Sequence, residues 1–152
     1  MKNAQAFWDS SVIVPLCCHQ AASQPLRRSL RQTSRLLVWW GASVEVNSAL
    51  ARLLRNGDIS GQDRLAAIRR LDVLKAGWRE INPSEKVRTL AETLPTQYSL
   101  RAMDAFQLSA ALIWCKEKPK GRVFVCADDR LAKAAESAGF TILHQLIPPK
   151  KT

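Results

Sequence analysis

The sequence predicts an α/β fold built on a parallel sheet, and two segments lead to this prediction. The apolar run at residues 123–125 passes through an acidic loop directly into a helical pattern. Near the N-terminus, residues 6–8 likewise run into Asp9 and then into a second apolar stretch. Short apolar strands that alternate with amphipathic helices are typical of parallel sheets, whose ligands bind beyond the carboxyl ends of the strands. Asp9 and Asp128 are therefore expected at that edge.

The remaining sequence supplies more strands and helices in alternation. Short apolar runs predict strands at residues 36–39, 78–81 and 140–143. Pro15 is expected to open the first helix, and Pro95 to stop a helix at residues 85–94. The other predicted helices cover residues 44–54, 62–76 and 100–114, with a last helix that ends at Gly139.

Residues 20–34 are polar and basic, and they predict a short surface helix interrupted by Pro25. Helical spacing brings several arginines of this region together. They are Arg27, Arg28, Arg31 and Arg35. This set fits a solvated helix face and a stripe that follows nucleic-acid phosphates about equally well.

Composition indicates an ordinary globular chain with a strongly basic charge. The 152 residues are 47% apolar and 24% charged, which fits one domain over residues 1–147 followed by a basic disordered tail at 148–152. The formal charge of +10 favours a polyanionic partner such as nucleic acid, or an acidic protein, over a membrane surface. No apolar run approaches the roughly 20 residues of a membrane span. Asp9 also interrupts the one candidate for a signal peptide, so a cytoplasmic protein is expected.

The cysteines and histidines do not form a metal-binding pattern. Four cysteines occur without a CxxC pair, and the two histidines, His19 and His144, are isolated in the sequence. Buried free thiols are therefore expected in place of zinc ligands or disulfides.

Acidic residues are placed unusually in the N-terminal third. Residues 1–56 contain only Asp9 and Glu45 as carboxylates, and both are surrounded by apolar sequence. A buried carboxylate is costly unless it is paired or bound to a metal. Glu45, in the first turn of its predicted helix, also fits simple compensation of the helix dipole.

Two further acids stand out in the C-terminal half. Asp104 interrupts the nearly all-apolar helix at 100–114, where aspartate is a poor helix former and its charge is expensive to bury, so a functional role is favoured. Asp128 precedes the last helix, and taken alone it is better explained as an N-cap.

Together, the four carboxylates of Asp9, Glu45, Asp104 and Asp128 could be aimed at one point, where they would repel one another unless a divalent cation such as Mg²⁺ or Mn²⁺ binds them. An acidic metal site in a basic protein suits a nuclease, in which the metal activates a water for attack on phosphorus.

Four motifs in order resemble those of PIN-domain ribonucleases, and among these the VapC toxins of bacterial toxin–antitoxin pairs. Any one of them is weak evidence, but the four span nearly the whole chain. The motifs are Phe7-Trp8-Asp9-Ser10-Ser11, Glu45 at the start of the helix at 44–50, Asp104 within residues 100–112, and Asp128 within residues 125–140.

The resemblance implies a three-layer α/β/α fold with a central parallel sheet and a Mg²⁺- or Mn²⁺-dependent endoribonuclease. It also implies a homodimer that is neutralised by a small antitoxin protein. Asp9, Glu45, Asp104 and Asp128 correspond to the family's acidic catalytic and metal-binding residues. Ser11 matches a small hydroxyl residue that often follows the first Asp by two positions.

Two positions depart from the family pattern. Cys126 stands where the family usually has Thr or Ser, and Asp129 adds a fifth acid beside Asp128. Asp128 is preferred for the metal because its Asp-x-x-Leu spacing to Leu131 fits the motif, with Asp129 as an auxiliary candidate.

Two alternatives to an RNA-cleaving toxin stay open. One is a non-catalytic RNA- or partner-binding module, whose acids form caps and salt bridges, and the other is a PIN nuclease outside toxin systems.

Overall fold

A five-stranded parallel sheet organises the part of the chain that the computed structural model describes, residues 4–18 and 23–143. The strand order is β3-β2-β1-β4-β5, and every neighbouring pair is parallel. The strands are β1 (Ala4–Trp8), β2 (Thr33–Trp39), β3 (Arg79–Ile81), β4 (Val123–Val125) and β5 (Thr141–Ile142). The predicted parallel α/β fold is thus confirmed.

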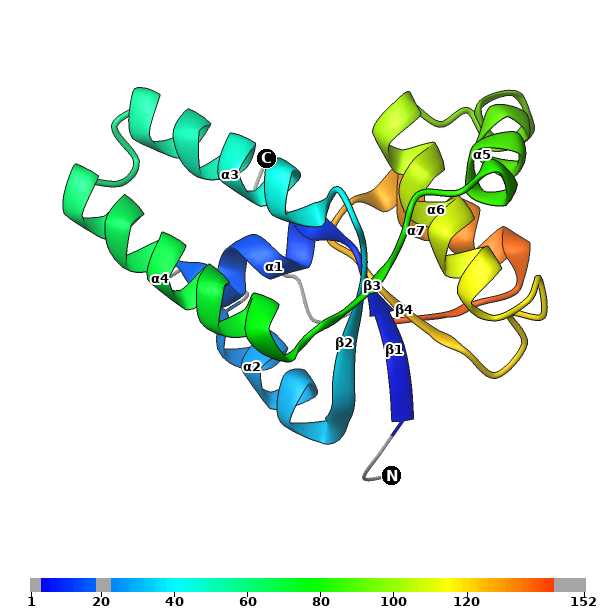
Figure 1. Ribbon diagram of the computed structural model, residues 1–152, viewed down its shortest axis with the longest axis horizontal. Helices are drawn as coiled ribbons and strands as arrows, with labels where there is room; N and C mark the ends of the chain where they lie inside the picture. Colours follow the sequence, from blue (N-terminus) through cyan, green and yellow to red (C-terminus); the bar gives the residue numbers. More distant parts are fainter. Residues whose placement is uncertain (1–3, 19–22, 144–152) are drawn as a thin grey trace.

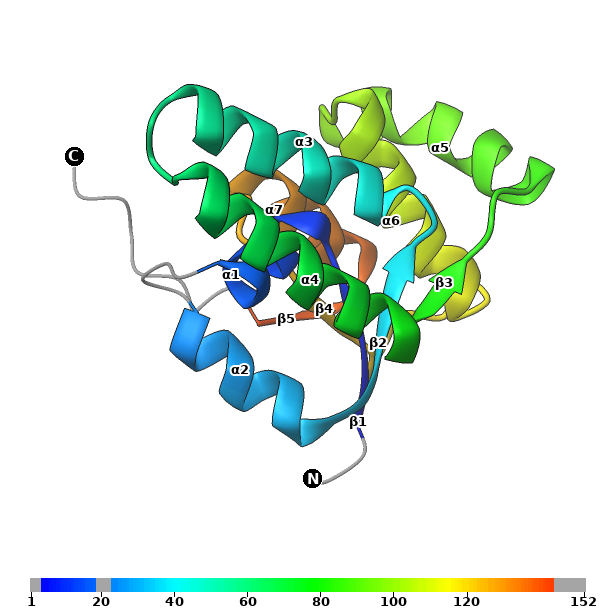
Figure 2. The same cartoon turned by 60° about the vertical axis from the view of Figure 1, so that its left-hand side comes forward.

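Helices cover both faces of this sheet (Figures 1 and 2). The first group consists of α1 (Ser10–Cys17), α2 (Ser23–Gln32), α3 (Ala42–Arg55) and α4 (Gly61–Gly77). The second consists of α5 (Glu85–Tyr98), α6 (Ala102–Trp114) and α7 (Asp129–Ala138). In Figure 1 the sheet is seen between the two groups, which gives the three-layer α/β/α arrangement that the resemblance implied.

Strand alternation divides the core into two clusters. Ala6 and Trp8 pack with the helices of the first group, while Phe7 packs with those of the second. Phe7 stacks on Phe124 of the neighbouring strand, with ring centroids 5.4 Å apart. Because successive side chains of a strand point to opposite faces, strands buried on both sides are apolar at every position.

The two proline boundaries were predicted wrongly. Helix α1 begins at Ser10, because Asp9 caps it, and Pro15 lies inside the helix. Helix α5 continues through Pro95 to Tyr98. A proline inside a helix removes one backbone hydrogen bond and costs about 3 kcal/mol. Burial outweighs this cost, since Pro15 lies in a helix that is buried along nearly its whole length and α5 packs along α6.

Several other expectations can be compared with the described residues. The four cysteines are buried free thiols, as predicted. No helix in residues 4–18 and 23–143 combines the length and apolarity needed to cross a bilayer. His19, His144 and the tail at 148–152 lie outside the described residues, so the domain boundary at residue 147 stays a prediction.

Candidate active site

The carboxyl ends of the parallel strands lie at one edge of the sheet, and two of the predicted site acids, Asp9 and Asp128, follow strands that end there. The strand order reverses between β1 and β4, because β2 and β3 extend from one side of β1 and β5 from the far side of β4. In open α/β sheets, ligands bind at such a reversal. Asp9 directly follows β1, and its backbone N–H donates to the carbonyl of Val125, the last residue of β4. Asp128 follows three residues after Val125.

Asp9 is a buried N-cap. Only 4% of its surface is exposed, and its Oδ2 accepts hydrogen bonds from both the backbone N–H and the hydroxyl of Ser11. Burial raises the pKa of the Asp9 carboxyl to about 7, helped by the negative charges of Glu45 and Asp104 and opposed by the Ser11 hydrogen bonds. A carboxyl whose pKa is raised this far by burial is a candidate functional group.

Ser11 connects the loops after β1 and β4. Its hydroxyl donates to Asp9, and it accepts a hydrogen bond of 2.9 Å from the backbone N–H of Ala127. The loop that carries Asp128 is therefore fixed to the same hydroxyl that orients Asp9. Ser11 was expected as an auxiliary site residue, and the structure gives it this positioning contact.

Glu45 lies in the first turn of α3 and is half-buried. Its Oε2 accepts a hydrogen bond of 2.6 Å from the Ser10 hydroxyl, and its Oε1 accepts one of 3.1 Å from Gln107 Nε2. Burial raises the pKa of the Glu45 carboxyl, the two hydrogen bonds oppose this, and the charge of Asp104 adds to it. Glu45 thus contacts groups from both helical layers.

Asp104 lies nearer its helix end than the sequence suggested. Helix α6 begins at Ala102, so Asp104 is in the first turn, where a carboxylate suits the positive end of the helix dipole. Burial raises its pKa, the charge of Asp128 raises it further, and Arg101 and Arg130 lower it. Asp104 interacts electrostatically with the other three predicted site acids. Its charge raises the pKa of Asp9 and of Glu45, and the charge of Asp128 raises the pKa of Asp104.

Asp128 is the N-cap of α7, as the simpler interpretation expected. Its Oδ1 accepts a hydrogen bond of 2.7 Å from the backbone N–H of Leu131. Its charge nevertheless acts on Asp104 and also on the buried thiol of Cys126, whose pKa is raised mainly by burial. Asp128 and Asp129 are both exposed, and Asp129 is the first residue of α7. The Asp-x-x-Leu spacing reflects the capping contact of Asp128, and the charge of Asp128 also acts on Asp104.

Four groups at this edge were not singled out from the sequence. Ser10 and Gln107 hold Glu45, while Arg101 and Arg130 lie within electrostatic reach of Asp104. The sequence did contain a signal for Gln107, because it is a polar residue in the same apolar helix in which Asp104 stood out. Gln107 is fully buried, and its Oε1 has no hydrogen-bond partner among the described residues.

The donor set fits a hard divalent cation in its chemistry. The candidate ligands are all carboxylate oxygens, as Mg²⁺ and Mn²⁺ prefer. Gln107 contacts Glu45 through Nε2, and its Oε1 is a buried acceptor without a partner among the described residues. Within the described residues, no three Asp, Glu, His or Cys side chains stand close enough to form a ready-made cage. Mg²⁺ often keeps several waters and uses only one or two carboxylates, so separated acids remain compatible with it.

The sheet order, the two helical layers and the acids at the carboxyl edge define a PIN-like α/β fold. No family model and no curated protein matches the sequence. Solved structures do match the fold. The crystal structure of PAE2754 from Pyrobaculum aerophilum has a TM-score of 0.63 at 18% identity and covers 95% of this chain and 94% of its own.

Two further solved structures match the fold, and one of them is described as a toxin–antitoxin complex. FitAcB from Neisseria gonorrhoeae matches with a TM-score of 0.60 at 15% identity, over 90% of this chain and 97% of that one. A toxin–antitoxin complex from Klebsiella pneumoniae matches with a TM-score of 0.59 at 14% identity, over 82% of this chain and 87% of that one. At such low identities these likenesses establish the fold alone.

Proposed function

We propose that this protein is a Mg²⁺- or Mn²⁺-dependent endoribonuclease that acts as the toxin of a type II toxin–antitoxin system. One observation carries the proposal. Acids from four separate helix N-termini interact electrostatically at the carboxyl edge of the sheet, and burial raises the pKa of three of them, Asp9, Glu45 and Asp104. A fold seldom retains such mutually unfavourable carboxylates without a cation or a proton to relieve them.

Asp9, Glu45, Asp104 and Asp128 would hold the metal, which supplies an activated water and neutralises charge on the attacked phosphate. The chain's own contacts orient these acids. Both hydrogen bonds from Ser11 go to Oδ2 of Asp9, so Oδ1 retains its capacity for a ligand. Because each carboxylate oxygen has two lone pairs, Glu45 can bind a further group while it accepts from its two donors.

The cations beside Asp104 support an anionic substrate. Arg101 and Arg130 are both exposed, and each stands close enough to lower the pKa of Asp104. Arginine binds phosphate oxygens through a planar pair of donors, and helix N-termini favour phosphate as well. We assign these two arginines to the phosphates that flank the cleaved bond.

The partner assignments rest on the resemblance and on the description of one matched structure. One matched structure is described as a toxin–antitoxin complex, which supports a small cognate antitoxin as partner. A homodimer and a cytoplasmic location belong to the same proposal. The arginines of α2 provide a candidate surface for the RNA backbone, though they fit a solvated face equally well.

A non-catalytic binding module is the competing function, and one observation favours it. Asp9 and Asp128 both cap helices, so each has a structural role that requires no metal. The two functions differ in what the metal does. A binding module holds RNA or a partner without Mg²⁺ or Mn²⁺ and cleaves nothing.

The test is cleavage of labelled single-stranded and structured RNAs by the purified protein, with Mg²⁺ or Mn²⁺ titrated. Asp104→Asn removes the charge that links the four acids, and Asp72→Asn, an exposed acid on α4, is the matched control. We expect metal-dependent cleavage in the wild type and the control, and none in Asp104→Asn. The single variants Asp128→Asn and Asp129→Asn, assayed side by side, show which of the two acids cleavage requires. Asparagine preserves the N-cap, so a loss of activity in Asp128→Asn is not caused by a lost cap. Full activity in both Asp9→Asn and Asp104→Asn would contradict the proposal.

A further inference from the structure

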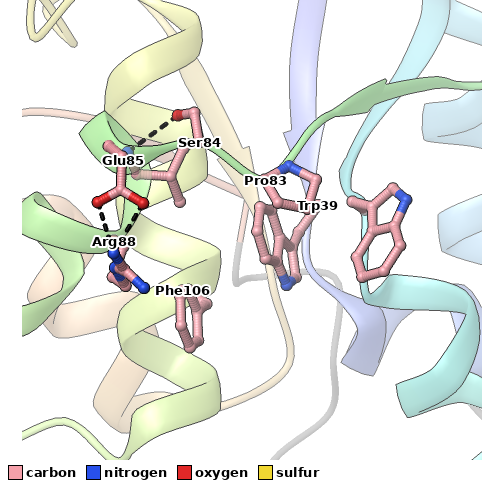
Figure 3. Close-up of a pocket in the computed structure, with 8 residues that line it drawn as sticks. Trp39, Pro83, Ser84, Glu85, Arg88 and Phe106 are labelled. Atoms are coloured by element: carbon pink, nitrogen blue, oxygen red, sulfur yellow. Dashed lines mark hydrogen bonds and ion pairs between the residues drawn. The ribbon is translucent and has the colours of Figure 1, made fainter.

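A pocket with aromatic walls opens at the carboxyl end of β2 (Figure 3). Its volume is about 380 Å³, within the range of small-molecule sites. Three parts of the chain build it: the end of β2 with the residue after it, the start of α5 with the two residues before it, and α6. The lining side chains used below are Trp39, Trp40, Glu85, Arg88 and Phe106.

Flat rings form much of this pocket. Trp39 and Phe106 stack with their planes 4° apart and their centroids 5.4 Å apart. Gly41 makes room for this arrangement, since a Cβ there would come within 2.8 Å of Trp39 Nε1. Trp40 is 53% exposed, which is unusual for so large an apolar side chain. The pocket therefore presents both a supported ring pair and a solvent-accessible indole.

The charges in the pocket compensate each other. Arg88 Nη2 donates to both carboxylate oxygens of Glu85, at 2.7 and 2.6 Å, and the pair lies on the α5 side of the pocket in Figure 3. The pair carries no net charge, but its side chains are 61% and 79% exposed, so the ion pair is weak. The rings therefore decide what the pocket binds, and they favour a flat group.

The pocket shares its elements with the candidate active site. Phe106 lines the pocket, while the next residue, Gln107, binds Glu45. Trp40 likewise precedes α3, which carries Glu45 in its first turn. A nucleic-acid strand with a phosphate at the acids would bring a flanking base towards these rings.

We propose that this pocket binds an unpaired nucleobase of the RNA substrate, next to the nucleotide at which the strand is cut. The inference rests on the proposed function and adds that the substrate is single-stranded around the cut. RNA recognition commonly stacks splayed bases on aromatic rings, and a base is flat, uncharged and attached to an anionic backbone. The net charge of +10 suits that backbone, while the aromatic lining of the pocket suits the base.

The test measures RNA affinity by fluorescence anisotropy in the presence of a chelator, so that cleavage does not interfere. The probes are a short labelled single-stranded RNA and an abasic oligomer of the same length. Trp40→Ala removes the exposed indole, and Trp40→Phe restores a ring. Leu65→Ala on α4 is the matched control, because Leu65 is 54% exposed and Trp40 is 53% exposed. The fold should survive these changes, since the Trp40 backbone N–H keeps its bond to the Ile81 carbonyl.

We expect Trp40→Ala to bind the RNA about tenfold more weakly, as for the loss of one stacked base. Trp40→Phe should recover most of the affinity, and Leu65→Ala should match the wild type. The salt dependence should be unchanged in Trp40→Ala, because no phosphate contact is lost. The abasic oligomer should bind the wild type and Trp40→Ala equally.

Unchanged RNA affinity in Trp40→Ala, or an equal loss with the abasic oligomer, would overturn the inference. If Trp40→Ala binds RNA normally but no longer binds a cognate partner protein, the pocket is a peptide-docking site and the inference is wrong. The proposed function fails separately. A wild-type protein that binds RNA through Trp40 but never cleaves it contradicts the nuclease, and of the inference it keeps only the base-binding pocket.

Discussion

Asp9→Asn should stabilise the metal-free protein at neutral and alkaline pH. Burial raises the pKa of Asp9 from 3.8 to about 7, so the folded protein resists the charged carboxylate. Asparagine is as good an N-cap as aspartate, and its side-chain oxygen can accept the same hydrogen bonds from Ser11. The substitution therefore removes the charge while it keeps the local geometry.

The magnitude follows from linkage. Between pH 3.8 and about 7 the folded state binds more protons at Asp9 than the unfolded state does, so stability falls as pH rises. The loss is absent below the lower value and complete above the higher one. Since each unit of pKa difference between the folded and the unfolded state is worth about 1.36 kcal/mol, the full loss of stability is about 4 kcal/mol. A new buried amide N–H₂ in the variant costs about 1–3 kcal/mol, so a net gain of roughly 1–3 kcal/mol should remain at high pH.

Urea unfolding with a chelator present, at pH 4 and pH 8, measures this difference. Asp9→Asn should fall below the wild type at the lower pH, by the cost of its buried amide, and exceed it at the higher pH. Asp72→Asn, on an exposed face of α4, controls for the general loss of one negative charge. A stability difference between Asp9→Asn and the wild type that does not change with pH would refute the reasoning.

Three further predictions follow from single contacts. Ser11→Ala should lower the free energy of unfolding by about 2 kcal/mol, because Asp9 loses its hydroxyl donor and the Ala127 N–H loses its acceptor; urea unfolding measures it, and a loss below 0.5 kcal/mol would contradict it. Gly139→Ala should cost about 1–3 kcal/mol by the same measurement, because Gly139 has φ +116° and a Cβ would meet Pro119 Cγ at 2.9 Å; an unchanged midpoint would contradict it. Mg²⁺ or Mn²⁺ at about 100 times its dissociation constant should raise stability by about 2.7 kcal/mol in the wild type and less in Asp9→Asn; equal gains in both proteins would remove Asp9 from the metal site.

The parallel sheet could be predicted because its strands are buried on both faces. Apolar runs of this kind, such as Leu36 to Trp39, need no alternation and stand out from the amphipathic helices between them. Helix boundaries at Pro15 and Pro95 could not be predicted in the same way. Local rules treat proline as a boundary, whereas burial of the surrounding helix decides whether one missing hydrogen bond is tolerated.

The site was predictable in its acids and much less so in their partners. Asp9 and Asp104 stood out because a charge in apolar sequence is costly whatever the fold. Ser10 carried no such signal, since a serine at the start of a helix is ordinary, and its contact with Glu45 spans 35 positions. Such a contact depends on how α1 and α3 are arranged, and this is a property of the tertiary structure.

Helix α6 connects the two sites of the molecule, and this determines which variants separate them. At about 100° per residue, Asp104 and Gln107 lie on nearly the same face, towards Glu45, while Phe106 is turned towards the pocket. Phe106→Ala would remove a ring that packs on the core and let α6 shift, so both the acids and the pocket would change. Trp40 extends into solvent from outside this helix, so its removal changes the pocket while α6 keeps its packing. A loss of RNA affinity in Trp40→Ala with cleavage of bound RNA at the normal rate therefore assigns the ring to substrate binding, and an equal loss of both would instead place it in the support of Glu45.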